Sequence, residues 1–112
     1  MKKLLLTAAL ILFPATAQAA CGEASWYGPG LYGNLTASGE VFRPGTKTAA
    51  HPWYPLGTYV RVTNRDNGRS VTVRINDRGP YVGGRIIDVA HGAASILGLT
   101  SSGLANVCLA RL

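Results

Sequence analysis

Side chains that usually bind metals or act as nucleophiles are scarce in this sequence. It contains two histidines, two cysteines and five carboxylates among 112 residues. The histidines are far apart and no cysteine pair has ligand spacing, so no tetrahedral metal site is expected. The sequence also lacks a G-x-S-x-G motif, a Walker loop and a dinucleotide fingerprint. We therefore expect neither a metal nor a cofactor.

Long apolar runs are also absent. Residues 1–19 start with the basic MKK, continue with the apolar LLLTAALILF and end in small residues, ATAQA, which form an A-x-A cleavage pattern. The apolar run is too short to span a bilayer comfortably. The sequence therefore predicts a cleaved signal peptide over residues 1–19 and one exported domain, periplasmic or secreted, over residues 20–112.

Acidic residues are outnumbered by basic residues. The chain has 11 basic and five acidic residues, a formal net charge of +6. A basic protein often binds nucleic acid, but export argues against that partner. An anionic extracytoplasmic polymer such as peptidoglycan fits better. The alternative is that the charge only keeps the protein soluble.

The two cysteines, Cys21 and Cys108, lie at opposite ends of the expected domain. An oxidising compartment permits a disulfide between them, and closing so long a loop would contribute about 4–5 kcal/mol. The alternative is a lipid anchor on Cys21. Lipoprotein cleavage usually requires a Leu-like residue where Gln18 stands, so the disulfide is favoured; a lipidated sulfur could not also form it.

Alternating apolar and polar residues predict short β-strands over most of the domain. TYVRVTN and SVTVRIN alternate in this way, and Asn67-Gly68 between them indicates a type I′ hairpin turn. EASWYG, KTAAH, IIDVA and ANVCLARL are further strand candidates. HGAASILGL has helical spacing and ends at Gly98, a suitable C-terminal residue. A long loop is expected between Gly28 and Gly45. About six short strands and one helix favour a closed barrel.

Two carboxylates stand in glycine-containing loops beside aromatic residues. Glu40 lies in TASGEVF and Asp77 in NDRGPY, and cleavage of a glycosidic bond needs a carboxylic acid that protonates the leaving oxygen. His51, in AAHPWYP, could orient a carboxylate or a sugar hydroxyl. Asp66 is interpreted as a turn residue, and Asp88, within IIDVA, as buried and paired. Several aromatic residues could stack on sugar rings, although some of them must belong to the hydrophobic core of so small a domain. They are Trp26, Tyr27, Tyr32, Trp53, Tyr54 and Tyr81.

These segments together resemble the RlpA family of lytic transglycosylases (rare lipoprotein A). The resemblance covers ASWYGPGLYGNLTASGEVF, TAAH and YVRVTNRDNGRSVTVRINDRGPYVGGRIIDVAHGAASILGL. It implies a mainly β fold, a six-stranded double-psi β-barrel with one short helix, shared with barwin, expansins, family-45 endoglucanases and MltA. Its motifs fall on Asp77, Glu40 and His51.

The resemblance implies endolytic cleavage of the MurNAc–GlcNAc β-1,4 bond of peptidoglycan glycan strands with formation of 1,6-anhydroMurNAc. Asp77 would be the general acid and then the base, while Glu40 and His51 would position the sugar or stabilise positive charge. No nucleic acid partner is expected, and the protein is expected to be a monomer. The residues expected to bind the glycan are Trp26, Tyr27, Tyr81, Arg78 and Arg74.

Two departures from the family keep alternatives open. Arg43 stands where the family usually has an aspartate, and we expect no C-terminal SPOR domain after the barrel. One alternative is a non-catalytic, expansin-like module that binds peptidoglycan or another polysaccharide. The other is a disulfide-closed secreted barrel with an unrelated partner, such as an inhibitor.

Overall fold

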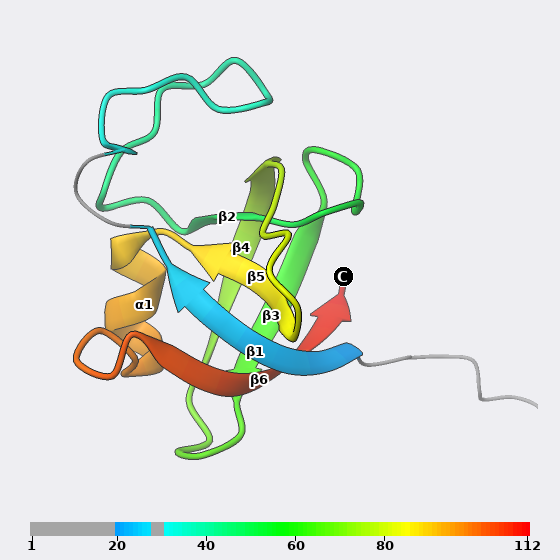
Figure 1. Ribbon diagram of the computed structural model, residues 1–112, viewed down its shortest axis with the longest axis vertical. Coiled ribbons are helices and arrows are strands. Elements are labelled where there is room, and N and C mark those ends of the chain that lie inside the picture. Colours follow the sequence, from blue (N-terminus) through cyan, green and yellow to red (C-terminus); the bar gives the residue numbers. More distant parts are fainter. Residues whose placement is uncertain (1–19, 28–30) are drawn as a thin grey trace, which may run out of the picture.

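A closed six-stranded barrel forms the body of the protein (Figure 1). The computed structural model describes residues 20–27 and 31–112, so the expected signal peptide over residues 1–19 lies outside the described residues. The elements are β1 (Ala20–Trp26), β2 (Thr48–Ala50), β3 (Tyr59–Asn64), β4 (Ser70–Asp77), β5 (Arg85–Val89), α1 (His91–Leu97) and β6 (Leu104–Arg111).

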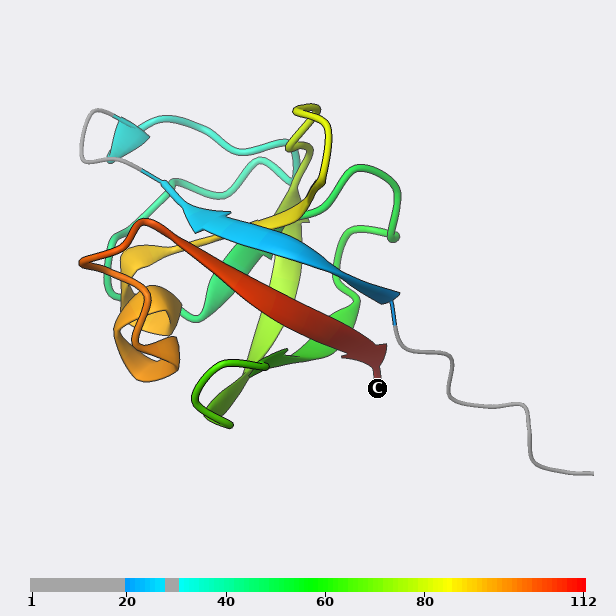
Figure 2. The same ribbon diagram turned by 60° about the horizontal axis from the view of Figure 1, so that its bottom comes forward.

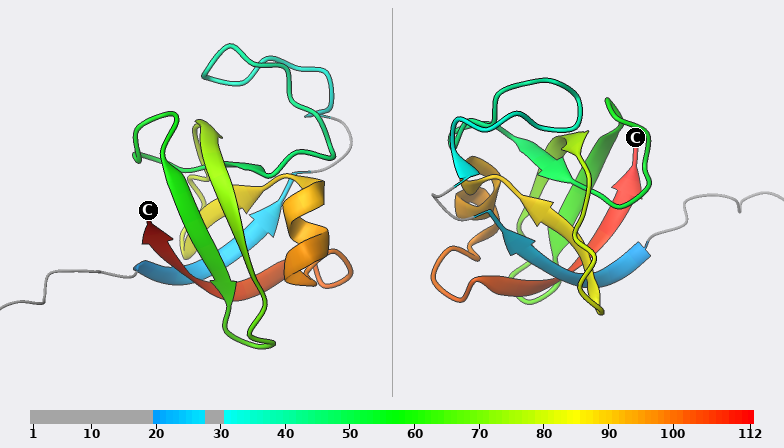
Figure 3. Two further views of the ribbon diagram at one scale, coloured as in Figure 1. Left: turned by 180° about the vertical axis from the view of Figure 1, so that it is seen from behind. Right: turned by 45° about the horizontal axis from the view of Figure 1, so that its top comes forward.

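The barrel closes in the order β1-β5-β2-β4-β3-β6. The β1–β5 and β2–β4 pairs are parallel, whereas the other pairs are antiparallel. Figure 2 shows β1 and β6 side by side, and Figure 3 shows α1 at one end of the barrel. The expected closed barrel of six strands with one short helix is confirmed.

Alternation along the strands builds the core. Val60 and Val62 of β3 face inward, as do Val73 and Ile75 of β4, and all four are fully buried. The polar residues between them face outward or lie at intermediate depth. Helix α1 buries two alanines and Leu97 against this core and ends at Gly98 in the left-handed conformation (φ 75°), as the sequence predicts.

The turn between β3 and β4 differs from the sequence prediction. A type I′ turn needs positive φ at both central residues, and here Gly68 has φ 78° but Asn67 does not have a positive φ. The Gly68 N–H instead donates to the carbonyl of Asn64 (2.8 Å), within a loop of residues 65–69. The Asn67 side chain accepts from the Arg69 N–H (2.8 Å) and donates to the Leu97 carbonyl (2.9 Å). These side-chain bonds favour the longer loop, so the type I′ prediction is wrong.

A disulfide joins the two ends of the described domain. Cys21 of β1 lies directly opposite Cys108 of β6, and the two sulfurs are bonded. This confirms the predicted bridge, and the same Cys21 sulfur cannot carry a lipid thioether while the bridge is present. No helix within the described residues is long and apolar enough to cross a membrane.

The long connection from β1 to β2 folds back over one end of the barrel (Figure 1). Its two arms are joined where the Phe42 N–H donates to the Asn34 carbonyl (2.8 Å) and the Gly33 N–H donates to the Phe42 carbonyl (3.0 Å). Its tip is tied to the barrel by the Ser38 N–H, which donates to the Asn76 carbonyl of β4 (3.1 Å). This connection, residues 31–47, is named the β1–β2 loop below.

Candidate active site

Asp77, the last residue of β4, has one fixed and one free carboxylate oxygen. Its Oδ1 accepts from the backbone N–H of Ala37 (3.0 Å), in the β1–β2 loop, and from that of Arg78 (2.9 Å). Among the described residues no hydrogen bond reaches Oδ2. The carboxyl group is therefore oriented through one oxygen, and the other is left to exchange a proton with a ligand.

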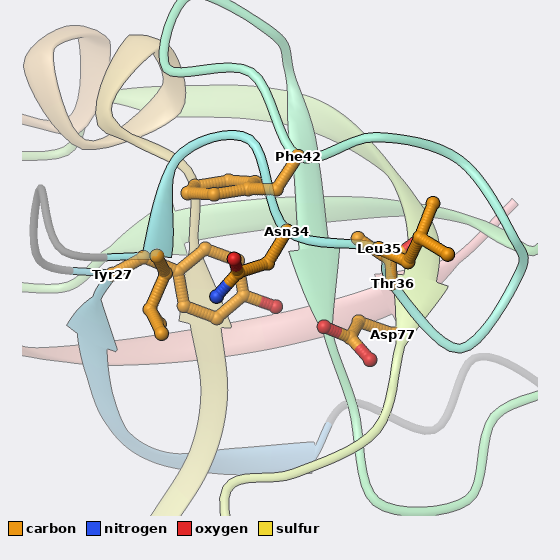
Figure 4. A pocket seen from close by; sticks show the side chains of 7 residues that line it. Tyr27, Asn34, Leu35, Thr36, Phe42 and Asp77 are labelled. Atoms are coloured by element: carbon orange, nitrogen blue, oxygen red, sulfur yellow. The ribbon is translucent and has the colours of Figure 1, made fainter.

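Asp77 lines a small pocket at this end of the barrel. The pocket has a volume of about 110 Å³, and it lies between the end of β1, the end of β4 and the β1–β2 loop (Figure 4). Residues far apart in the sequence therefore meet at Asp77. The lining residues are Tyr27, Leu31, Asn34, Leu35, Thr36, Phe42 and Asp77.

The hydroxyl of Tyr27 is directed toward the Asp77 carboxylate (Figure 4). It is buried, and no described residue forms a hydrogen bond with it. Burial, and then the negative charges of Asp77 and Asp88, raise the pKa of the Tyr27 phenol. Tyr27 is therefore a neutral O–H donor facing the carboxylate at any working pH.

Glu40 is paired with Arg74 rather than free. The Arg74 guanidinium donates to both carboxylate oxygens (2.6 and 2.8 Å), and Asn76 adds a bond to Oε1 (3.1 Å). The hydrogen bonds from Arg74, and then from Asn76, lower the pKa of Glu40 to about 2. Glu40 is therefore an ionised carboxylate near neutral pH and cannot serve there as a proton donor.

The arginines near Asp77 in the sequence make their side-chain bonds elsewhere. Arg74 binds Glu40, and Arg78 donates from Nη1 to the carbonyls of His51 (3.1 Å) and Tyr54 (2.7 Å). Neither guanidinium forms a hydrogen bond with the Asp77 carboxylate. Arg74 thus holds the Glu40 carboxylate, and Arg78 holds the backbone at His51 and Tyr54. Neither occupies the Asp77 carboxylate.

His51 is a buried, neutral histidine. Its Nδ1 accepts from the backbone N–H of Trp53 (3.2 Å) and of Tyr54 (3.0 Å), and its ring stacks on the Tyr54 ring at 3.6 Å. Burial, followed by the positive charges of Arg78 and Arg111, lowers the pKa of His51 to about 4. Because Nδ1 is an acceptor, the ring proton is on Nε2, and His51 can offer an N–H donor but not an acid.

His51 is also connected to Asp77 through the backbone. The His51 N–H donates to the Asp77 carbonyl (3.1 Å), where β2 ends beside β4. This bond brings the AAH segment to the same barrel end as the NDRGP segment. The structure therefore gathers Asp77, Glu40 and His51 around one end of the barrel, although only Asp77 lines the pocket.

The remaining expected ligand-binding residues lie in different surroundings. Tyr27 lines the pocket, whereas Trp26 packs against His91 of α1 with 5.0 Å between ring centroids. Tyr81, in the loop after β4, is 77% exposed. Arg43 is exposed beside the pocket residue Phe42.

Asp88 was expected to be buried and paired, and it is paired but only half-buried. Its Oδ1 accepts a hydrogen bond from the buried Ser25 hydroxyl of the neighbouring strand β1. The alternation of β5 places Ile87 and Val89 inward on either side, so Asp88 faces the other way. Within the described residues no group of three or more His, Cys, Asp or Glu could hold a metal ion.

Sequence reasoning did not identify several residues of the site. Asn34, Leu35, Thr36 and Phe42 line the pocket because the β1–β2 loop folds back onto β4. Their segment has no periodicity that would indicate its path. The one available signal is the unusual presence of leucines in a Gly- and Asn-rich loop, since large exposed apolar groups often mark binding sites.

Comparison with known proteins matches residues 19–109 to a family described as lytic transglycolase. The chain belongs to this family. Curated relatives of this chain include the probable endolytic peptidoglycan transglycosylase RlpA of Synechocystis, 59% identical over 79% of this chain and 27% of the relative. The endolytic peptidoglycan transglycosylase RlpA of Campylobacter jejuni is 50% identical over 85% of this chain and 34% of the relative. The chain thus spans only about a third or less of these relatives.

Solved structures with the same fold include two proteins of other function. A Streptomyces papain inhibitor superposes with a TM-score of 0.69 at 22% identity, over 85% of this chain and 94% of the inhibitor. An expansin of Clavibacter michiganensis superposes with a TM-score of 0.66 at 22% identity, over 85% of this chain and 50% of the expansin. At such identities the likeness concerns the fold alone, and it confirms the double-psi β-barrel for this chain.

Proposed function

We propose that this domain cleaves the glycan strands of peptidoglycan as an endolytic transglycosylase. The observation that carries the proposal is the oriented Asp77 carboxyl group, with Oδ2 free, in a pocket of a lytic transglycolase barrel. The names of the RlpA relatives supply the substrate class. A peptidoglycan substrate implies an extracytoplasmic location, periplasmic or secreted, and a monomer is sufficient for the reaction.

The proposed reaction needs one group that both gives and takes a proton. Protonated Asp77 gives its proton from Oδ2 to the glycosidic oxygen between MurNAc and GlcNAc, and the C1–O bond breaks toward an oxocarbenium-like state. The Asp77 carboxylate then accepts the proton of the MurNAc C6 hydroxyl as that oxygen attacks C1. The product is a 1,6-anhydro ring, and no water enters the reaction.

The neighbouring groups suit supporting roles in this reaction. Glu40 stays ionised, so its charge can stabilise the developing positive charge on the sugar or orient its hydroxyls. His51 offers a neutral N–H donor, and the Tyr27 hydroxyl is directed toward the Asp77 carboxylate (Figure 4). In this proposal Arg74 and Arg78 support the site by holding Glu40 and the backbone around His51. Candidate stacking surfaces for more distant sugars are Tyr81 and Trp26.

A binding module of the expansin kind is the second candidate. It is favoured by the exposed cation Arg43 beside the pocket, where the RlpA resemblance leads one to expect a carboxylate. In that case the protein would bind wall polysaccharide through the same end of the barrel without releasing soluble products.

The test is to incubate the domain with purified sacculi and denuded glycan and to analyse the soluble products by mass. We expect anhydro-terminated fragments, which are lighter by one water than hydrolysis products. Asp77→Asn should lower the cleavage rate at least about 100-fold. It should fold normally, because the amide oxygen can accept the same two N–H bonds.

Two other acids serve as controls. Asp66→Asn, in the exposed β3–β4 loop, should change neither cleavage nor stability. Asp88→Ala removes the acceptor of the buried Ser25 hydroxyl, so it should lose about 1–3 kcal/mol of stability and should cleave as long as it is folded. Cleavage by Asp77→Asn at the wild-type rate would disprove the assignment, and binding without any product would favour the expansin-like candidate.

A further inference from the structure

The pocket beside Asp77 is too small for a sugar ring but large enough for a substituent of one. Its volume of about 110 Å³ is smaller than the roughly 150 Å³ of a cavity that binds one benzene molecule. A pyranose unit with its hydroxyls needs more room than this. A group of a few heavy atoms fits, provided that the sugar carrying it lies at the pocket's mouth beside Asp77.

One wall of the pocket is apolar and partly uncovered. Phe42 is buried within this wall, whereas Leu31 is 46% exposed and Leu35 is 73% exposed. Exposed leucines at a pocket lose contact with water only when a ligand covers them, which favours an occupant with an apolar end. Asn34, Thr36 and Asp77 line the same pocket (Figure 4), so the occupant needs a polar end as well.

The polar end of the pocket is a carboxamide. The exposed side chain of Asn34 lines the pocket (Figure 4). A carboxamide presents one acceptor and two donors side by side. It is therefore complementary to another amide, whose N–H and C=O can pair with it.

We propose that this pocket binds the acetamido group on C2 of an N-acetylated sugar. The methyl group lies against Leu35 and Phe42, and the amide pairs with Asn34. The apolar wall disfavours a charged occupant, whether a carboxylate or an unacetylated ammonium group, by desolvation. The inference deepens the proposed function, on which it rests for the choice of an N-acetylated substrate.

The consequence is selection for N-acetylated glycans over glucans that carry a hydroxyl on C2. A hydroxyl neither reaches the apolar wall nor pairs with the carboxamide. The combined loss of one buried methyl group and one hydrogen bond corresponds to about a tenfold weaker affinity or more. This preference is measurable without any bond cleavage.

The experiment titrates the domain with three tetrasaccharides and follows the backbone amide signals by NMR. The probes are the β-1,4 tetramers of N-acetylglucosamine, of glucose and of glucosamine. We expect the N-acetylglucosamine tetramer to bind about tenfold tighter than the glucose tetramer, with signals moving at Leu35 and Asn34. The glucosamine tetramer should also bind more weakly, despite its positive charge.

A matched pair of variants tests the amide. Asn34→Leu keeps the approximate shape but removes the carboxamide, so affinity for the acetylated tetramer should fall about threefold to tenfold while affinity for the glucose tetramer stays unchanged. Asn106→Leu, on the exposed face of β6, is the control and should bind as the wild type does. Both positions are exposed, so neither change should unfold the protein.

Several outcomes would overturn the inference. These are equal affinity for acetylated and unacetylated tetramers, binding of none of them, signal changes confined to other regions, or full affinity in Asn34→Leu. The proposed cleavage is judged separately, on sacculi and with Asp77→Asn. An acetyl preference without cleavage would refute the proposed function and leave this pocket assignment intact, and cleavage without the preference would do the reverse.

Discussion

Replacing Gly92 with alanine should disturb the active site from the side of helix α1. A Cβ at Gly92 would lie 2.7 Å from the carbonyl oxygen of Gly45, 2.9 Å from the Gly45 carbonyl carbon and 3.0 Å from the Thr46 oxygen. The Gly92 N–H also donates to the Pro44 carbonyl (2.8 Å). All of these contacts are with backbone atoms of the β1–β2 loop, so no flexible side chain can move aside.

Two opposing effects set the size of the change. Alanine is favoured over glycine in a helix by about 1 kcal/mol or less. Forcing extra atoms into a packed contact costs about 1–3 kcal/mol. We expect a net loss of about 1–2 kcal/mol, which lowers the melting temperature by roughly 4–8 °C per kcal/mol in a domain of this size.

The loop displacement should also reach the pocket. Gly45 and Thr46 follow Phe42 by only a few residues, and Phe42 forms the buried part of the apolar wall. A shifted loop therefore changes the space beside Asp77. Glycan cleavage and tetrasaccharide binding by Gly92→Ala should both decline at temperatures where the protein is still folded.

Thermal or urea unfolding measures the loss, and Gly83→Ala is the matched control. At Gly83 no heavy atom lies within 4 Å of the position that a Cβ would occupy, and φ is not positive. Alanine there should leave the free energy of unfolding within about 0.5 kcal/mol of the wild-type value. If Gly92→Ala is as stable as wild type or more so, the helix preference outweighs the contact, and the reasoning about the loop is wrong.

Three further predictions concern the groups around the barrel end. Reducing the Cys21–Cys108 disulfide should remove about 4–5 kcal/mol of stability, and an unchanged urea midpoint in reductant would contradict this. His51 has a folded pKa of about 4, below its ordinary 6.5. The unfolded chain therefore binds the proton first as the pH falls. The free energy of unfolding present above pH 6.5 should decrease by up to about 3 kcal/mol on acidification to pH 4. His51→Gln should remove this part of the pH dependence, and an equal dependence in that variant would count against the prediction. Arg74→Gln should raise the pKa of Glu40 from about 2 toward 4.5, as carboxyl carbon NMR can measure, and no rise would show that the pair does not control this carboxylate.

Most of the fold was predictable because its signals are local. The alternation in residues 59–64 and 70–77 fixes which side chains face the core, and Gly98 marks the helix end. The turn between those strands was not predictable from Asn67-Gly68. Its form depends on a hydrogen bond from Asn67 to the Leu97 carbonyl of α1, a contact that the local sequence does not contain.

The site was predictable only in part, for a related reason. The position of Asp77 at a strand end followed from the glycines and proline after it. The hydrogen-bond partners of the Arg74 and Arg78 guanidinium groups could not be predicted, because the position of a residue in a strand indicates which face its side chain is on but not which residue it contacts. Arg74 binds Glu40, which lies 34 residues earlier, and Arg78 binds the carbonyl of His51, 27 residues earlier.

The environments of the two carboxylates bear on the type of product. Inverting hydrolysis would need a second carboxylate that is free to take a proton from water. Glu40 is held by a bidentate guanidinium and an amide, and its pKa of about 2 makes it a poor base. Asp77 keeps one oxygen free of protein donors among the described residues. One proton-exchanging group beside one permanently charged group suffices for attack by the sugar's own C6 hydroxyl, whereas an inverting hydrolase needs a second free base on the opposite face of the sugar, and this favours anhydro ends over the reducing ends of inverting hydrolysis.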